Sequence, residues 1–131
     1  MTGLDTNVLV RYIMQDDARQ SPKATKLVES LTVDETGFVS MMSVVELGWV
    51  LSSSYGLTRE QLAQAFEALL RTKEVVIERA DNVLKALRLF KAASADFADC
   101  LIERAAASAG CDRTMTFDIG AAKAARMTLI P

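Results

Sequence analysis

The segment TGLDTNVLVRYI, residues 2–13, carries the pattern on which the fold assignment depends. Its first four residues, TGLD, are a short strand candidate. Thr6 or Asn7 is the expected cap of the apolar helical stretch VLVRYI that follows. A strand that runs almost directly into a helix is the repeating unit of α/β proteins. We therefore looked for the same unit along the rest of the chain.

The alternation of strand and helix continues to the end of the sequence. Further strands are expected at residues 37–41, 75–77, 113–117 and 128–130. The intervening helices are expected to begin at Ser21, Ser43, Thr58, Asp81 and Asp96, with a last short helix at residues 121–126. This order predicts a mainly parallel sheet with helices on both of its faces.

The composition indicates one globular domain that spans residues 1–131. Half of the residues are hydrophobic and 24% are charged, which is typical of a folded chain with a core. The formal net charge is only −2, so no strong basic field attracts nucleic acid. Contacts with RNA or DNA must then depend on local basic patches or on a metal ion.

The absence of histidine narrows the possible chemistry. It excludes Ser-His-Asp and Cys-His mechanisms and zinc sites with histidine ligands, so we expect carboxylates to do the chemistry. Cys100 and Cys111 form no CxxC pattern, and we interpret them as reduced core thiols. We expect no signal peptide and no membrane association, because the apolar run VVELGWVL is short and interrupted by Glu46. A cytoplasmic location is the resulting expectation.

Three acidic residues are expected at one edge of the sheet. Asp5 and Asp118 directly follow predicted strands, and Glu46 lies in the expected first turn of the helix after the second strand. Sites in open parallel sheets form beyond the carboxyl ends of the strands. Asp34 and Asp112 precede strands, so we expect them at the opposite edge and exclude them.

The segment SADFADC, residues 94–100, adds two more carboxylates. Asp96 and Asp99 are three residues apart, which on a helix places them on one face about 5–6 Å from each other. One interpretation is a helix N-cap at Asp96, with Asp99 in the first turn. The other is part of a metal site. The order of elements does not decide which end of the sheet this helix begins from.

Each acidic residue also has a purely structural interpretation. Ser43-x-x-Glu46 matches a capping box, and Asp5 and Asp118 suit amide contacts at strand-to-helix turns. Taken together, however, gathered carboxylates raise one another's pKa unless a cation compensates. No lysine or arginine lies in the local motif of Asp5, Glu46 or Asp118. A divalent cation resolves the repulsion, and oxygen ligands suit Mg²⁺ or Mn²⁺ better than zinc.

Four segments resemble the acidic motifs of PIN-domain proteins, and in detail those of VapC-type toxins from type II toxin–antitoxin pairs. The segments are LDTNVLVRYI, SVVELGWVL, ADFADCLIERAA and TMTFD. The resemblance implies a three-layer α/β/α fold around a mainly parallel central sheet. It also implies that an acidic cluster holds Mg²⁺ or Mn²⁺, formed by Asp5, Glu46, Asp99 and Asp118.

The resemblance assigns supporting roles as well. Asp96 matches an acidic position that holds water or a second cation, and we assign it mainly to capping. Asn7 and Thr116 match polar positions that fix the cluster. The implied activity is that of an endoribonuclease, with phosphodiester hydrolysis by metal-activated water on structured RNA such as tRNA. The implied partners are a second copy of the chain and a VapB-type antitoxin whose tail covers the site.

Basic residues that suit phosphate contacts are Arg11, Arg19, Lys23, Lys26 and Arg113. Two alternatives to the nuclease were weighed. A phosphatase of the haloacid dehalogenase type needs a second aspartate two residues after Asp5, where this chain has Asn7. The other alternative is a catalytically silent PIN-like module that works only through its partner protein.

Overall fold

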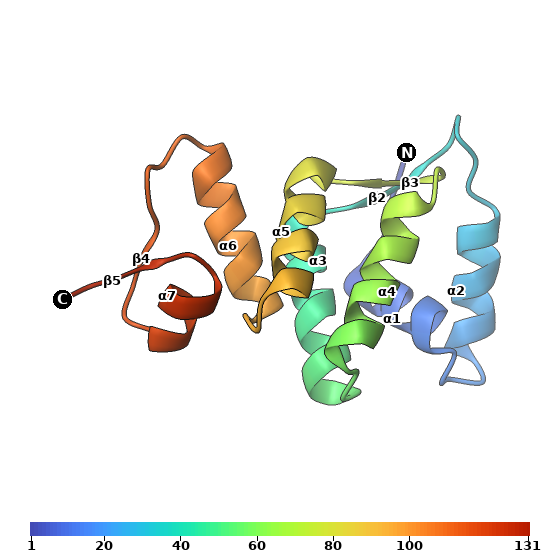
Figure 1. Ribbon diagram of the computed structural model, residues 1–131. Helices are drawn as coiled ribbons and strands as arrows, with labels where there is room; N and C mark the ends of the chain where they lie inside the picture. The colour runs from blue at the N-terminus through green and yellow to red at the C-terminus, as the bar shows by residue number, and fades with distance from the viewer. The chain divides into compact units, whose positions relative to one another are not determined.

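The computed structural model describes residues Met1–Pro131 (Figure 1), and the chain forms two compact units. We refer to Met1–Glu78 as the first unit and to Arg79–Pro131 as the second unit. The expectation that residues 1–131 form one domain stays a prediction. None of the helices is both long and apolar enough to cross a bilayer.

The first unit contains a three-stranded parallel sheet in the order β1-β2-β3. Its elements are β1 (Thr2–Gly3), α1 (Thr6–Met14), α2 (Gln20–Glu29), β2 (Gly37–Val39), α3 (Met41–Trp49), η1 (Val50–Ser54), α4 (Arg59–Arg71) and β3 (Val75–Ile77). Thr2 lies opposite Gly37, and Val39 lies opposite Ile77. Parallel pairing of strands joined through helices confirms the predicted α/β class.

The core of the first unit lies under the middle strand. Val39 of β2 is fully buried, and Leu47, Leu51 and Phe66 of the helices are fully buried as well. The apolar face of α4 packs into this core, because Leu62, Phe66 and Leu69 are all buried. This core fixes the direction in which α1 and α3 leave the sheet, and both helices carry candidate site residues.

A π-helix, η1, continues α3 through Ser54. The segment η1 runs through Ser54, Tyr55 follows it, and Gly56 adopts a φ of 65° that favours glycine. Short π-helical segments are rare and occur often at functional sites. Here the segment determines where the Tyr55 side chain lies.

The second unit contains a two-stranded parallel sheet. Its elements are α5 (Ala80–Ala92), α6 (Phe97–Ser108), β4 (Met115–Thr116), α7 (Ile119–Ala124) and β5 (Thr128–Leu129). Helices α5 and α6 pack against each other, as Figure 1 shows, and the rings of Phe90 and Phe97 meet edge to face at 5.5 Å. Cys100 is fully buried, whereas Cys111 is exposed. The interpretation of Cys111 as a core thiol was therefore wrong.

The predicted helix starts at Ser21, Ser43 and Asp81 were also wrong, and α3 begins at Met41 after its N-cap Ser40. Asp17 Oδ1 accepts hydrogen bonds from the amides of Arg19 and Gln20, so α2 begins before Ser21. Ser21 instead accepts a hydrogen bond from the Asp17 amide. In α5, Asp81 lies in the first turn rather than at the cap, and it pairs with Arg79. The predicted cap at Thr58 is confirmed, and Gln61 completes a capping box.

Gly37 provides a stability test of the packing around β2. A Cβ atom there would meet Leu4 Cδ1 and Leu31 Cδ1, each at 2.8 Å. We expect Gly37→Ala to lower the free energy of unfolding by about 1–3 kcal/mol, because overfilling a packed core forces neighbours out of their preferred rotamers. Gly3→Ala is the matched control, since a Cβ at Gly3 meets no atom within 4 Å. Equal denaturant midpoints for the two variants would contradict this packing.

Candidate functional site

Asp5 lies where β1 passes into α1. Its backbone is extended, and its Oδ1 accepts a hydrogen bond from the amide of Thr6 at 2.8 Å. Asp5 is thus the N-cap of α1, and the expectation that Thr6 or Asn7 caps this helix was wrong. Thr6 is buried and is already the first residue of the helix, so the capping position lies one residue earlier, at Asp5. The second oxygen of Asp5, Oδ2, makes no hydrogen bond in the structure.

Glu46 lies in the second turn of α3, not in the first. Ser40 is the N-cap of α3, and its hydroxyl accepts a hydrogen bond from the Ser43 amide at 3.1 Å. The capping box that we considered for Ser43 and Glu46 is therefore absent. Glu46 has an exposed side chain and no capping role, so the structural interpretation of this residue loses its basis.

Asp5, Asn7 and Glu46 line one cleft of about 370 Å³ in the first unit. The argument from strand ends predicted that Asp5 and Glu46 share an edge, and the cleft agrees with it. Two other residues lie in the wall of this cleft: Arg11, which the sequence offered as a phosphate contact, and Tyr55, which sequence reasoning missed. Arg11 lies six residues after Asp5, less than two helical turns away. This spacing was the sequence signal that Arg11 lies near Asp5.

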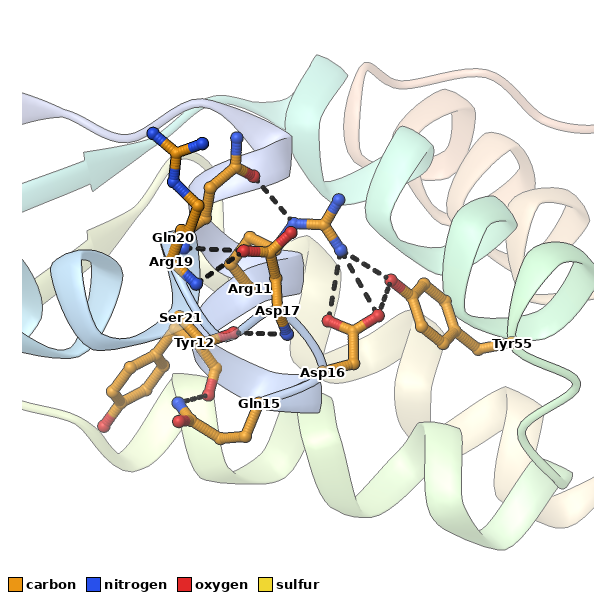
Figure 2. Close-up of polar contacts among 9 residues, drawn as sticks. All are labelled: Arg11, Tyr12, Gln15, Asp16, Asp17, Arg19, Gln20, Ser21 and Tyr55. Carbon is orange, nitrogen blue, oxygen red and sulfur yellow. Dashed lines mark hydrogen bonds and ion pairs between the residues drawn. The ribbon is translucent and has the colours of Figure 1, made fainter.

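Figure 2 shows how Arg11 and Tyr55 are held. Arg11 Nη1 donates to both oxygens of Asp16, at 3.1 and 3.3 Å, and to the Tyr55 hydroxyl at 3.1 Å. Tyr55 in turn donates to Asp16 Oδ2 at 2.7 Å, and Arg11 Nε donates to Gln20 at 2.9 Å. The hydrogen bond from Tyr55 lowers the pKa of Asp16, and Arg11 adds to this effect. The same contact raises the pKa of Tyr55.

The second unit holds the other three candidate acids. Asp96 is the N-cap of α6 and accepts a hydrogen bond from the Ala98 amide at 2.8 Å, as its capping interpretation required. Asp99 is half-buried in the first turn of the same helix. Asp118 is the N-cap of α7 and accepts a hydrogen bond from the Ala121 amide at 3.0 Å.

The pKa of the Asp99 carboxyl is shifted by its surroundings. Its pKa is raised by partial burial first, and then by the negative charges of Asp96 and Asp118. Since both charges that act on Asp99 are negative, the ionised cluster is not compensated. Thr116 supports the same region, because its hydroxyl accepts a hydrogen bond from the Asp118 amide at 3.0 Å.

Gly120 was not a candidate from the sequence, yet its missing side chain leaves space for the Asp118 carboxylate. A Cβ atom at this position would lie 3.1 Å from Asp118 Oδ1, closer than ordinary van der Waals contact. A side chain here would press on the carboxylate. A glycine two residues after an aspartate was the only signal available in the sequence.

The candidate residues are thus divided between the two units. Asp5, Asn7 and Glu46 belong to the first unit, and Asp96, Asp99, Thr116 and Asp118 belong to the second. Neither unit by itself holds three ligating side chains close enough together for a metal ion.

The sequence matches the family model of the PIN domain over residues 4–127. Because this match covers nearly the whole chain, the protein belongs to the PIN domain family. The match and the parallel strands with their helices confirm the predicted α/β fold class, which in this family is the three-layer α/β/α fold. PIN domains are typically nucleases and generally use divalent metal ions. A comparison with curated protein sequences found no match.

The raised pKa of Asp99 leads to a test of stability against pH. An acid whose pKa is raised on folding destabilises the fold above that pKa, and the penalty disappears below the unfolded value of 3.8. In buffer without divalent cations at pH 7, we expect Asp99→Asn to raise the melting temperature by roughly 1–3 °C. Near pH 3, wild type and variant should melt alike. A lower melting temperature for the variant at pH 7 would contradict the repulsion.

Proposed function

We propose that this PIN-domain protein is a divalent-metal-dependent endoribonuclease, the toxin of a VapBC-type toxin–antitoxin pair, acting on structured RNA such as tRNA. The family match over residues 4–127 supports the proposal, and the observation that carries it is the placement of Asp5 and Glu46 in one cleft of the first unit. In the second unit, the pKa of Asp99 is raised first by partial burial and then by the charges of Asp96 and Asp118. A helix cap requires one carboxylate, and at Asp99 the favourable helix dipole does not fully offset the burial and repulsion of a second one. A bound divalent cation would compensate these negative charges.

The donor atoms fit a hard divalent cation. All the candidate ligands are carboxylates, and Mg²⁺ and Mn²⁺ prefer oxygen donors. We propose that four side chains hold the metal: Asp5, Glu46, Asp99 and Asp118. When bound, a divalent cation lowers the pKa of a coordinated water and offsets the negative charge of the phosphodiester.

The proposed ligands hold their carboxylate oxygens in fixed positions. Asp5 and Asp118 each use one carboxylate oxygen to cap a helix, which restricts the rotamer and leaves the other oxygen available. Thr116 holds the backbone at Asp118, and Asn7 lines the cleft with Asp5. We propose that Thr116 and Asn7 orient the ligands and that Asp96 orders water beside Asp99. Such supporting contacts commonly change metal affinity by about 10–100-fold.

The most direct variant is Asp5→Asn. Asparagine caps a helix about as well as aspartate, so α1 should keep its start and the melting temperature should change little. The charge that attracts the metal is removed, and we expect the rate of RNA cleavage in Mg²⁺ to fall about 1,000-fold or more. Cleavage is measured on end-labelled RNA in gels.

Asp34→Asn is the matched control for this experiment. Asp34 is an exposed aspartate that precedes β2, and the variant should cleave RNA as the wild type does. Wild-type activity in Asp5→Asn, or undiminished cleavage by the wild type in excess EDTA, would contradict the proposed mechanism. A wild type that binds RNA in Mg²⁺ but never cleaves it would favour the silent binding module.

We also propose that the chain forms a homodimer and binds a VapB-type antitoxin. An exposed apolar stripe on α3 supports an interface: Met42, Val45 and Trp49 have 81%, 40% and 64% of their surfaces exposed. Their spacing places them on one side of the helix. Large exposed apolar side chains gathered in this way mark interaction surfaces.

The oligomeric state can be measured by light scattering. We expect the wild type to have twice the chain mass of 14.3 kDa. Trp49→Lys should shift the protein toward the monomer, because a buried charge at an interface is costly. Tyr12→Lys is a control on a different helix. A monomeric wild type at micromolar concentration would contradict the dimer.

A further inference from the structure

A second cleft adjoins the first on the same unit and has no role in the proposal above. It has a volume of about 280 Å³, and it is lined by Asn7, Val8, Arg11, Gln20, Lys23, Ala24 and Leu27. Two of these residues, Asn7 and Arg11, also line the cleft that contains Asp5 and Glu46. The Arg11 side chain therefore forms part of the wall that the two clefts share.

The Arg11 guanidinium is fixed but not saturated with hydrogen bonds. Nη1 and Nε are engaged by Asp16, Tyr55 and Gln20, whereas Nη2 makes no hydrogen bond in the structure. Figure 2 shows Nη2 pointing away from Asp16 and Tyr55. A guanidinium has five donors in a rigid plane. Its orientation is thus set before any ligand arrives, and donors remain for an anion.

The second cleft has the chemistry of a nucleotide site. Lys23 adds a cation that no carboxylate pairs with in the structure, which matters because Asp16 balances the charge of Arg11. Gln20 contributes an amide, and Val8, Ala24 and Leu27 form an aliphatic wall. A phosphate suits the guanidinium and the ammonium, and a ribose or base suits the aliphatic wall.

We propose that this second cleft binds a phosphodiester of the RNA next to the one that is cleaved. Arg11 donates hydrogen bonds to this phosphate, and Lys23 contributes positive charge. The inference rests on the proposed ribonuclease function, because it takes the Asp5 and Glu46 cleft as the place of reaction. It adds the direction of the RNA strand, which runs from the carboxylates across Arg11 toward α2.

Asp16 and Tyr55 act on the RNA through Arg11. Tyr55 follows the π-helical segment η1, and its hydroxyl bonds both Arg11 and Asp16. Tyr55→Phe keeps the ring and removes only this hydroxyl. The guanidinium then keeps its charge but loses one of the contacts that fixes it, so affinity should fall while the number of phosphate contacts stays the same.

The test is RNA binding as a function of salt, in the Asp5→Asn background that is expected not to cleave. The probe is a fluorescent single-stranded RNA in Mg²⁺, and its integrity is checked on gels after each titration. Each phosphate contact contributes about 0.7 to the slope of log K against log salt for single strands. We expect Arg11→Ala and Lys23→Ala each to reduce the slope by about 0.7.

Two further variants separate charge from positioning. Lys26→Ala is the matched control. The sequence offered Lys26 as a phosphate contact, but the structure places it exposed on the same helix as Lys23 and outside the cleft, so the slope for this variant should equal that of the background protein. Tyr55→Phe should weaken binding about fivefold with no change in slope, the effect of one lost hydrogen bond. Circular dichroism establishes that each variant is folded.

The possible failures are distinguishable. If Arg11→Ala and Lys23→Ala have the slope of Lys26→Ala, or if the RNA does not bind at all, the second cleft is not an RNA site. Cleavage of the probe in the Asp5→Asn background contradicts the proposed function instead. If a reduced slope accompanies intact RNA and wild-type cleavage in Mg²⁺, both proposals stand.

Discussion

The turn from a short parallel strand into the next helix is the constraint on which this structure depends. Strands β1 and β4 are only two residues long, and an aspartate follows the last strand residue by two positions in both cases, at Asp5 and Asp118. Each aspartate satisfies a free amide at the start of a helix. The same position lies beyond the carboxyl end of a strand, where α/β folds bind ligands. Structural and functional demands therefore coincide at these residues.

Helix N-termini also explain why so many carboxylates are tolerated. The positive end of the helix dipole favours a negative charge in the first turn, which offsets part of the repulsion. At α6 this compensation is incomplete. Asp99 lies in the first turn behind the Asp96 cap, and its pKa is raised first by partial burial and then by the charges of Asp96 and Asp118. A divalent cation removes the remaining penalty, and this links the fold to the proposed chemistry.

Much of this organisation could be predicted from the sequence, because the signals are local. The strand at residues 75–77, the cap at Asp96 and the alternation of strand and helix all depend on near neighbours. The start of α2 could not be predicted from Ser21, because Asp17 accepts the hydrogen bonds from the amides of Arg19 and Gln20. The contact between Asp16 and Tyr55 joins residues 39 positions apart, so it is not a local signal. It also depends on a π-helix, which the hydrophobic periodicity of the sequence does not predict.

The central proposal is that Asp5, Glu46, Asp99 and Asp118 hold one divalent cation, and one measurement tests it most directly. A crystal of the protein soaked in Mn²⁺ gives an anomalous difference map in which the manganese ion appears as a peak. We expect a peak within coordination distance of carboxylate oxygens of Asp5, Glu46, Asp99 and Asp118. A fully occupied peak that lacks Asp5, or that lacks Asp99 and Asp118, would contradict this proposal, and so would the absence of a peak at millimolar Mn²⁺.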